Sequence, residues 1–230
     1  MTQTIHTPAA TRPVHAARPA HAARPAVRPL LGCAMAAGPL FLVTGVVQGL
    51  LRDGYDFTRN AISQLSLGDL GWIQKTGFAL TGVLIIAGAV GIRRVLDGGP
   101  GGVWAPRLVA VFGASFLVSA VFTADPGAGF PAGTPDGPAA SLSTSGAVHM
   151  LGGMVGYLAL CAAFFVLARR FSAQGQRVWA VASRIVPVAV LAGFAGSAAS
   201  VLVFTAGAAL GLVWLTATTA RLAAAPGSSS

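Results

Sequence analysis

The stretch Ile185–Ala220 reads IVPVAVLAGFAGSAASVLVFTAGAALGLVWLTATTA and contains no charged residue. A single helix over these 36 residues would be about 54 Å long at 1.5 Å per residue, whereas the hydrocarbon core of a bilayer is about 30 Å thick. Two shorter helices that turn at the small residues Gly196–Ser200 match that thickness. The stretch therefore predicts a transmembrane hairpin, although the residue at which its two helices separate stays open.

The composition of the whole chain also indicates an integral membrane protein. Of its 230 residues, 54% are hydrophobic and 9% are charged, whereas soluble proteins average about 25% charged residues. A net charge of +9 would suggest nucleic acid in a polar protein, but these charges are few and scattered, so we expect no nucleic-acid partner. The expected surroundings are the lipid bilayer. Because Lys75 is the only Lys among 15 basic residues, the codon usage favours a GC-rich bacterium, and we expect a multi-pass protein of the bacterial plasma membrane.

Six apolar segments in total are near the length needed to cross a bilayer, so the fold class predicted is an all-α bundle of six transmembrane helices. The expected segments are Leu30–Leu51, Trp72–Ile92, Pro106–Ala124, Val148–Ala168, Val178–Ser197 and Val201–Ala220. Together they form one expected domain, residues 29–222. The basic, Pro-interrupted tail of residues 1–28 and the C-terminal tail of residues 223–230 are expected to be disordered.

Positive charge is distributed unevenly between the alternating loops. If six helices cross the membrane, 12 of the 15 basic residues lie on the side of the two termini, and five of the six acidic residues lie on the other side. Short loops rich in Lys and Arg stay in the cytoplasm. The charges therefore predict that both termini are cytoplasmic.

Small residues recur four positions apart within the segments, as at Gly45 and Gly49 and at Gly152 and Gly156. Such pairs let helix backbones approach closely in a membrane. They could form a homodimer interface or pack within one chain, and we expect packing within the bundle. The oligomeric state itself stays open.

The loop between the first two segments, residues 52–71, is polar and is expected outside the cell. Asp56 is placed as an N-cap, and the apolar residues that follow share one helical face up to Gly68. This pattern predicts a short interfacial helix across the mouth of the bundle, with Ser63 and Gln64 on its polar faces. Trp72 would mark the headgroup level.

Asp125 and His149 are expected at neighbouring helix ends on the same side of the membrane, at the two ends of a long loop. A carboxylate that orients an imidazole is the arrangement of general bases and of metal ligands. The alternative, which we favour, is an interfacial histidine that is hydrogen-bonded to the loop, beside a solvated carboxylate.

Two kinds of metal-containing site, a haem held by two histidines and a zinc site rich in Cys or His, need more ligands than this chain offers. His149 is the only histidine outside the N-terminal tail, which argues against a haem held by two histidines, and a zinc site rich in Cys or His lacks ligands. No phosphate-binding loop or nucleophile elbow occurs in a supporting context. We therefore expect no cofactor, and we leave the question of a metal open. No ionisable residue lies near the middle of a segment, which argues against ion-coupled transport without excluding it.

Three pieces of the sequence resemble the domain-of-unknown-function 998 family of bacterial, commonly actinobacterial, integral membrane proteins. The pieces are Gly54-Tyr55-Asp56 with Ile62-Ser-Gln-Leu-Ser-Leu-Gly68 and Gly71-Trp-Ile-Gln74; Phe122-Thr-Ala-Asp-Pro126 with Phe130-Pro131 and Gly133; and His149 with Gly152-Gly153. They occur in order over residues 30–221. The resemblance implies a six-helix membrane protein and supplies no activity.

The leading functional hypothesis is a non-catalytic membrane protein whose polar outer vestibule binds a lipid headgroup or a small solute. Its candidate ligand-binding residues all belong to the expected outer face: Tyr55, Asp56, Ser63, Gln64, Trp72, Asp125 and His149. The alternative is a hydrolase or transferase that acts on a lipid or cell-envelope substrate, with His149 as base or metal ligand, Asp125 as its orienter and Asp56 as a further carboxylate. A channel or facilitator ranks third, because the helices carry few polar residues.

Overall fold

The computed structural model describes residues 27–137 and 141–224, and this part of the chain is helical, with no strand. Its elements follow one another in the order α1 (Val27–Leu51), η1 (Ile62–Ser66), α2 (Gly71–Leu96), α3 (Trp104–Val121), α4 (Thr144–Ala173), α5 (Arg177–Ala195), η2 (Gly196–Ala198) and α6 (Val201–Ala223). The six α-helices of the described residues are each long and apolar enough to cross a membrane. The predicted fold class is confirmed. The expected disordered tails fall almost entirely outside the described residues.

Local capping explains where α4 and α6 begin. α4 starts at Thr144, ahead of the predicted Val148, because the Ser143 hydroxyl accepts a hydrogen bond from the backbone N–H of Gly146. The predicted hairpin between α5 and α6 is present, and its turn contains η2. Ser200 then caps α6 by accepting from the N–H of Val203.

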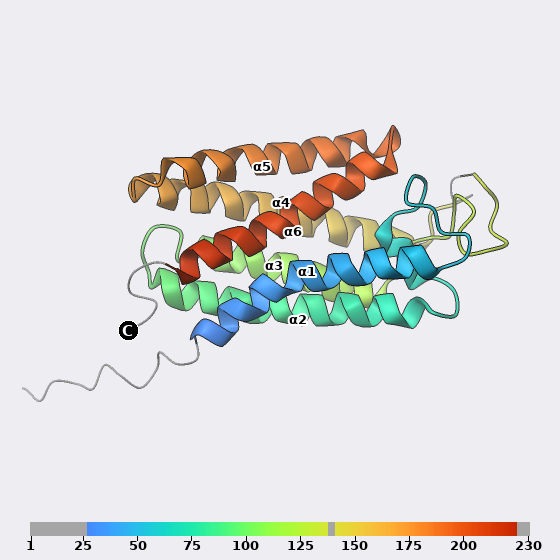
Figure 1. Ribbon diagram of the computed structural model, residues 1–230, viewed down its shortest axis with the longest axis horizontal. Helices are drawn as coiled ribbons and strands as arrows, with labels where there is room; N and C mark the ends of the chain where they lie inside the picture. Colours follow the sequence, from blue (N-terminus) through green and yellow to red (C-terminus); the bar gives the residue numbers. More distant parts are fainter. Residues whose placement is uncertain (1–26, 138–140, 225–230) are drawn as a thin grey trace, which may run out of the picture.

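The helices form a ring in which neighbours along the chain lie side by side and α6 returns to α1 (Figure 1). Glycine lets α1 and α2 touch, since a Cβ atom added to Gly88 would lie 2.2 Å from Cβ of Ala34. The Thr216 hydroxyl of α6 donates to the Met35 carbonyl of α1 at 3.2 Å. We call the end of the bundle with Val27 and Ala224 the terminal end, and the end with residues 52–70, 122–137 and 141–143 the loop end.

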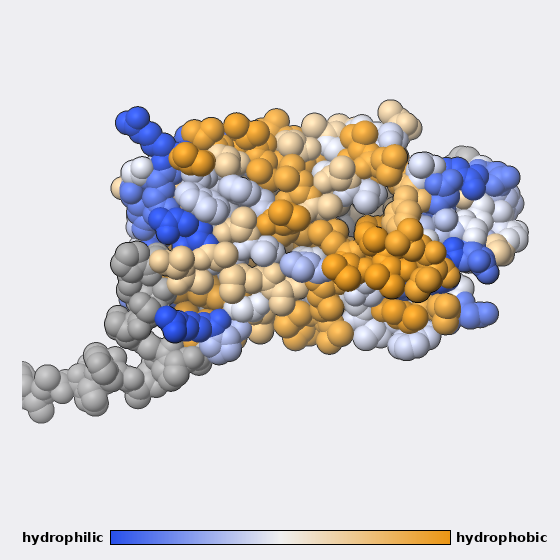
Figure 2. All heavy atoms as spheres, viewed as in Figure 1, coloured by the Kyte–Doolittle hydropathy of each residue, from blue (hydrophilic) through white to orange (hydrophobic). Residues whose placement is uncertain are grey.

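The outer surface has the pattern of a protein surrounded by lipid. A hydrophobic band covers the middle of the molecule and hydrophilic residues gather at both ends (Figure 2). Large apolar side chains on the band are exposed, such as Val43 (62%) and Val213 (52%). Such exposure would be costly in water and is favourable in a bilayer.

The small residues noted in the sequence make contacts within the chain, as expected. A Cβ on Gly45 would lie 2.7 Å from the Ile62 side chain, and one on Gly49 would lie 2.4 Å from the Phe57 ring. Gly156 faces α3 in the same way. These glycines are therefore occupied by intramolecular packing.

The interior is packed differently in the two halves of the ring. Toward the terminal end it is filled by large side chains such as Phe164, Leu167 and Phe171, each at most 1% exposed. Toward the loop end, α1 and α2 share a buried amide pair in which Gln48 donates to Gln74 at 2.6 Å. The loop-end half also contains a cavity.

Candidate functional site

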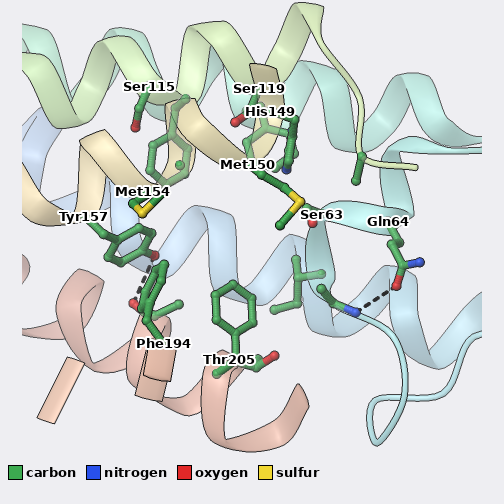
Figure 3. Close-up of a pocket in the computed structure, with 18 of the residues that line it drawn as sticks. Ser63, Gln64, Ser115, Ser119, His149, Met150, Met154, Tyr157, Phe194 and Thr205 are labelled. Atoms are coloured by element: carbon green, nitrogen blue, oxygen red, sulfur yellow. Dashed lines mark hydrogen bonds between the residues drawn. The ribbon is translucent and has the colours of Figure 1, made fainter. Parts of the chain in front are cut away.

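The cavity has a volume of about 600 Å³ and lies inside the loop-end half of the ring (Figure 3). Ligand pockets commonly measure about 300–1,000 Å³. Most of its wall is apolar, and all six α-helices contribute to it. Its large apolar residues include Phe41, Phe78, Phe116, Met150, Met154, Phe194, Phe204 and Leu212.

The floor of the cavity is closed. The Tyr157 hydroxyl of α4 donates to the Ala208 carbonyl of α6 at 3.2 Å, which joins the two helices across the bottom of the cavity (Figure 3). Beyond Tyr157 on α4, Leu160 and Phe164 are fully buried. Among the described residues, the cavity wall therefore ends at Tyr157 on α4 and one turn past Ala208, at Leu212, on α6, and it does not continue to the terminal end.

The roof is formed by residues 55–66, which we call the lid. Ile62, Ser63 and Gln64 of the lid line the cavity. The Gln64 side chain accepts from the backbone N–H of Ala61 at 3.0 Å and donates to the Gly127 carbonyl at 3.2 Å. Gln64 thus connects the lid to the loop between α3 and α4.

Other polar side chains fasten the lid from outside the cavity. Asn60 is 1% exposed and donates to the Ala128 carbonyl at 3.2 Å. Arg52 donates to the carbonyls of Leu65 at 3.1 Å and Leu67 at 2.7 Å. Tyr55 donates to the Asn60 carbonyl at 3.0 Å. Burial, and then the neighbouring Asp56 charge, raise the pKa of Tyr55, so its hydroxyl stays protonated as a donor.

The helix predicted after Asp56 is wrong in its position. Asp56 does accept from the Thr58 N–H, at 2.8 Å, but residues 57–59 form a turn, and the helical segment is the 3₁₀ helix that begins at Ile62. The cause is Asn60, whose side-chain oxygen takes the N–H of Asp56 at 2.9 Å, since Asn side chains compete with helical backbone bonds. Hydrogen bonds from Thr58, first of all from its hydroxyl, lower the pKa of Asp56.

Asp125 lines the cavity and is held at the start of α4. Its carboxylate accepts from the backbone N–H of Ser143 at 3.0 Å and from the Ser143 hydroxyl. A carboxylate is stabilised at the N-terminus of a helix, where the backbone dipoles are positive. Only glycine fits beside it, since a Cβ on Gly146 would lie 2.0 Å from Oδ2 of Asp125.

His149 lies in the cavity wall near Ser119 and Met150 (Figure 3). Its Nδ1 atom is 2.9 Å from the Phe122 carbonyl oxygen, and its ring meets the Phe78 ring edge to face at 5.9 Å. A carbonyl oxygen can only accept, so Nδ1 carries a hydrogen and Nε2 of the neutral ring is an acceptor. The orienter of the imidazole is therefore Phe122 and not Asp125.

The structure separates the seven candidate residues into three groups. Ser63, Gln64, Asp125 and His149 line the cavity together. Tyr55 and Asp56 belong to the lid but not to the cavity wall. Trp72 is 63% exposed on α2, beside a small apolar groove at Leu40 and Thr44, away from the others.

Sequence reasoning missed several cavity residues. Ser115 and Ser119 are four positions apart on α3 and both line the cavity, as does Thr205 of α6. The serine spacing was a usable signal, because residues at i and i+4 share a helix face. Tyr157 carried no such signal. Its role depends on the distant Ala208.

A metal centre is not built into the described part of the chain. No group of three or more His, Cys, Asp and Glu side chains comes together in residues 27–137 and 141–224 in a way that could hold an ion. Protein metal sites usually need about three such ligands.

Comparison with known proteins adds one finding. No curated protein and no solved structure matches the chain. A family model described as "Protein of unknown function (DUF998)" matches residues 35–225, which extend from α1 to the end of α6 and include the lid and the whole cavity wall. The chain therefore belongs to the DUF998 family.

Proposed function

We propose that this membrane protein binds a lipid headgroup or a small solute in the loop-end cavity and does not transform it. The observation that carries the proposal is the cavity itself, which has a ligand-sized volume and four of the candidate polar residues in its wall. A largely apolar pocket with a few polar groups is the usual form of a small-molecule site.

The hydrolase or transferase has less support. Both oxygens of Asp125 accept hydrogen bonds from Ser143, and Nδ1 of His149 is bonded to Phe122. A general base needs a positioned orienter and a nucleophile within hydrogen-bond reach, and Asp125 does not orient His149. The channel has less support because Tyr157 and the packed residues beyond it close the floor.

The proposed location is the bacterial plasma membrane, with both termini in the cytoplasm and the loop end, which contains the cavity, on the outer side. The support is the charge distribution, since the Arg residues in the helix ends that flank the α2–α3 and α4–α5 loops lie at the terminal end and most Asp residues at the loop end. Alkaline phosphatase fused after Asp136 should be active in bacterial cells, and the same enzyme fused to the C-terminus should be inactive. The reverse result would invert the topology.

Ligand binding can be tested with a pair of variants on α6. Ala208 lines the cavity and Ala206, two positions away, is exposed on the outside of the bundle. The full chain is purified in lipid nanodiscs, and small molecules that remain bound are detected by native mass spectrometry. Wild type and Ala206→Trp should carry a bound molecule, whereas Ala208→Trp, which fills the cavity, should not. Equal occupancy in the two variants, or none in wild type, overturns the proposal.

A further inference from the structure

We propose that the ligand is a membrane lipid with one hydrocarbon chain and an uncharged, hydroxyl-bearing head, and that it enters the cavity sideways from the bilayer between α1 and α6. This inference rests on the proposed function and specifies the class of molecule that the cavity takes.

The size of the cavity fits one chain. A methylene group is similar in size to a water molecule, whose share of liquid volume is about 30 Å³. The cavity volume of about 600 Å³ thus accommodates about 20 groups of this size. One chain with a small head has about that number of atoms, and a two-chain phospholipid has more than twice as many. The apolar rings and thioethers of the wall, including Met150 and Phe204, suit a hydrocarbon chain.

The ring of helices is parted on one side at the loop end. α6 lies against α1 in its terminal half, where Gly38 meets Leu212 and Thr216. In its loop-end half α6 packs instead on α5, with Gly207 against Gly193, and diverges from α1 (Figure 1).

The divergence leads from the lipid-facing surface to the cavity. Leu42 of α1 and Thr205 of α6 line the cavity on its two sides, and Ile62 of the lid lies at its upper edge. The neighbouring outer residues Val46 and Leu202 are 44% and 48% exposed. Figure 2, which has the same view as Figure 1, shows a hollow in the surface where α6 diverges from α1, next to a hydrophobic patch. A lipid chain could therefore pass inward without crossing water.

The polar groups of the cavity suit hydroxyl groups. The Ser119 side chain is 5% exposed, lies on the cavity wall (Figure 3) and has no hydrogen-bond partner among the described residues. The Ser63 hydroxyl of the lid is also without a side-chain partner in residues 27–137 and 141–224. Two hydroxyls that can donate or accept and a neutral imidazole with a free acceptor match a head group with several hydroxyls.

An anionic head has no counter-charge in the cavity. Among the described lining residues there is no Lys or Arg, and the one charged residue is the carboxylate of Asp125. The nearby Arg52 guanidinium is committed to two backbone carbonyls and the Phe130 ring, and Arg59 pairs with Asp56. Phosphate recognition in proteins generally uses Arg, Lys or helix N-termini. The N-terminus of α4 is already occupied by Asp125. The cavity therefore selects against phosphate.

Two probes that differ only in a phosphate group test the head-group preference. One is a palmitoyl monoacylglycerol with a photoactivatable diazirine on the chain, and the other is the corresponding lysophosphatidic acid. With the full chain in nanodiscs, the first should label peptides of α4 and α6 from the cavity wall, and the label should be lost in Ala208→Trp and kept in Ala206→Trp. Unlabelled monoacylglycerol should compete at least tenfold better than lysophosphatidic acid. Equal competition overturns the head-group assignment.

A second pair of variants tests the lateral entry. Leu42 lines the cavity at the parting of α1 and α6, and Val43 next to it is 62% exposed to lipid. Leu42→Trp should slow photolabelling several-fold at short exposure to the probe, and Val43→Trp should leave it unchanged. Equal rates in the two variants overturn entry between these helices.

Failure of this inference can be told from failure of the proposed function. If native mass spectrometry finds a water-soluble molecule that is lost in Ala208→Trp, while the lipid probe labels no cavity peptide, the site binds a solute and the lipid assignment is wrong. If neither a bound molecule nor cavity labelling is found, both proposals are wrong.

Discussion

Nδ1 of His149 on α4 lies 2.9 Å from the carbonyl oxygen of Phe122, the residue that follows α3. This bond fixes the ring in the cavity wall and connects two helices at their loop ends. His149→Phe keeps the ring and its contact with Phe78 but removes the bond. We expect it to destabilise the fold by about 1 kcal/mol, the usual net value of one hydrogen bond. Thermal unfolding in detergent measures this loss.

The same variant tests ligand recognition. If Nε2 accepts a hydrogen bond from the ligand, His149→Phe should weaken binding about tenfold, which corresponds to about 1.4 kcal/mol. Asp125→Ala provides a comparison, because Asp125, which is bonded to Ser143 at the start of α4, also lines the cavity. Unchanged binding in both variants would remove these residues from the binding site.

Gly146 is the position at which the start of α4 is least tolerant. Gly146→Ala places a Cβ atom 2.0 Å from the Asp125 carboxylate, which must then leave Ser143. Overpacking of this kind typically costs about 1–3 kcal/mol. Gly153→Ala on the same helix meets nothing within 4 Å and should be neutral or slightly stabilising. Circular dichroism during heating distinguishes them, and similar melting temperatures would contradict the assigned packing.

The attachment of the lid can be loosened at Gly49. A Cβ there would lie 2.4 Å from the Phe57 ring and 2.9 Å from the Tyr55 ring, so these rings must shift to make room. Gly49→Ala should therefore accelerate hydrogen exchange in residues 55–66 while the helices remain protected. Gly32→Ala, on the same helix but with no atom within 4 Å, is the control and should leave the lid protected. Equal exchange in both would contradict the contact.

Asp56 gives the lid a dependence on pH. Its pKa in the folded chain is lowered, chiefly by the Thr58 hydroxyl, from an ordinary value of 3.8. A carboxylate with a lowered pKa stabilises the fold above its ordinary pKa, and this contribution is lost as the pH falls through the lower folded value. Asp56→Asn should therefore melt earlier than wild type at pH 7, and the difference should shrink below about pH 4. A difference that grows in acid would reverse the assigned sign.

The amide pair of Gln48 and Gln74 should behave asymmetrically. Gln48 donates to Gln74 at 2.6 Å, while Oε1 of Gln48 and Nε2 of Gln74 are buried with no partner in the described chain. Gln48→Leu leaves Gln74 wholly unpaired and should cost about 1–3 kcal/mol. The double variant with Gln74→Leu removes both polar groups and should recover most of the loss. A double variant as unstable as the sum of the single variants would contradict this coupling.

The six helices were predictable because a bilayer imposes length and apolarity on each span. Thus the charge-free stretch Ile185–Ala220 identified the α5–α6 hairpin correctly. The helix ends were less predictable. α4 begins at Thr144 because of a cap by Ser143, and α2 extends past the predicted Ile92 to Leu96. Capping contributes about 1 kcal/mol, which average hydropathy does not register.

The site was only partly predictable. The order of the loops and helices in the sequence predicted that Ser63, Gln64, Asp125 and His149 lie at one end of the bundle, and these four do line the cavity. It could not show that Asp125 binds Ser143 or that His149 binds Phe122, since those partners are set by how the helices pack.

Nothing in the sequence indicated which apolar residues form the wall of the cavity. Met154 and Phe194 face an empty space, while Phe164 and Leu167 fill the core, yet all four are large apolar residues within transmembrane segments. Composition and periodicity treat such residues alike. Whether they enclose a cavity is decided by the divergence of α6 from α1, which depends on the small residues at Gly38, Gly193 and Gly207.

Because the hydrogen bond from Tyr157 to Ala208 closes its floor, the cavity does not pass through the bundle from one end to the other. Whatever enters can leave only by the leaflet or the solution from which it came, unless α4 and α6 move apart. A protein of this shape can store, shield or present a molecule to a neighbour on the same side of the membrane, and its occupancy would follow the composition of that one leaflet.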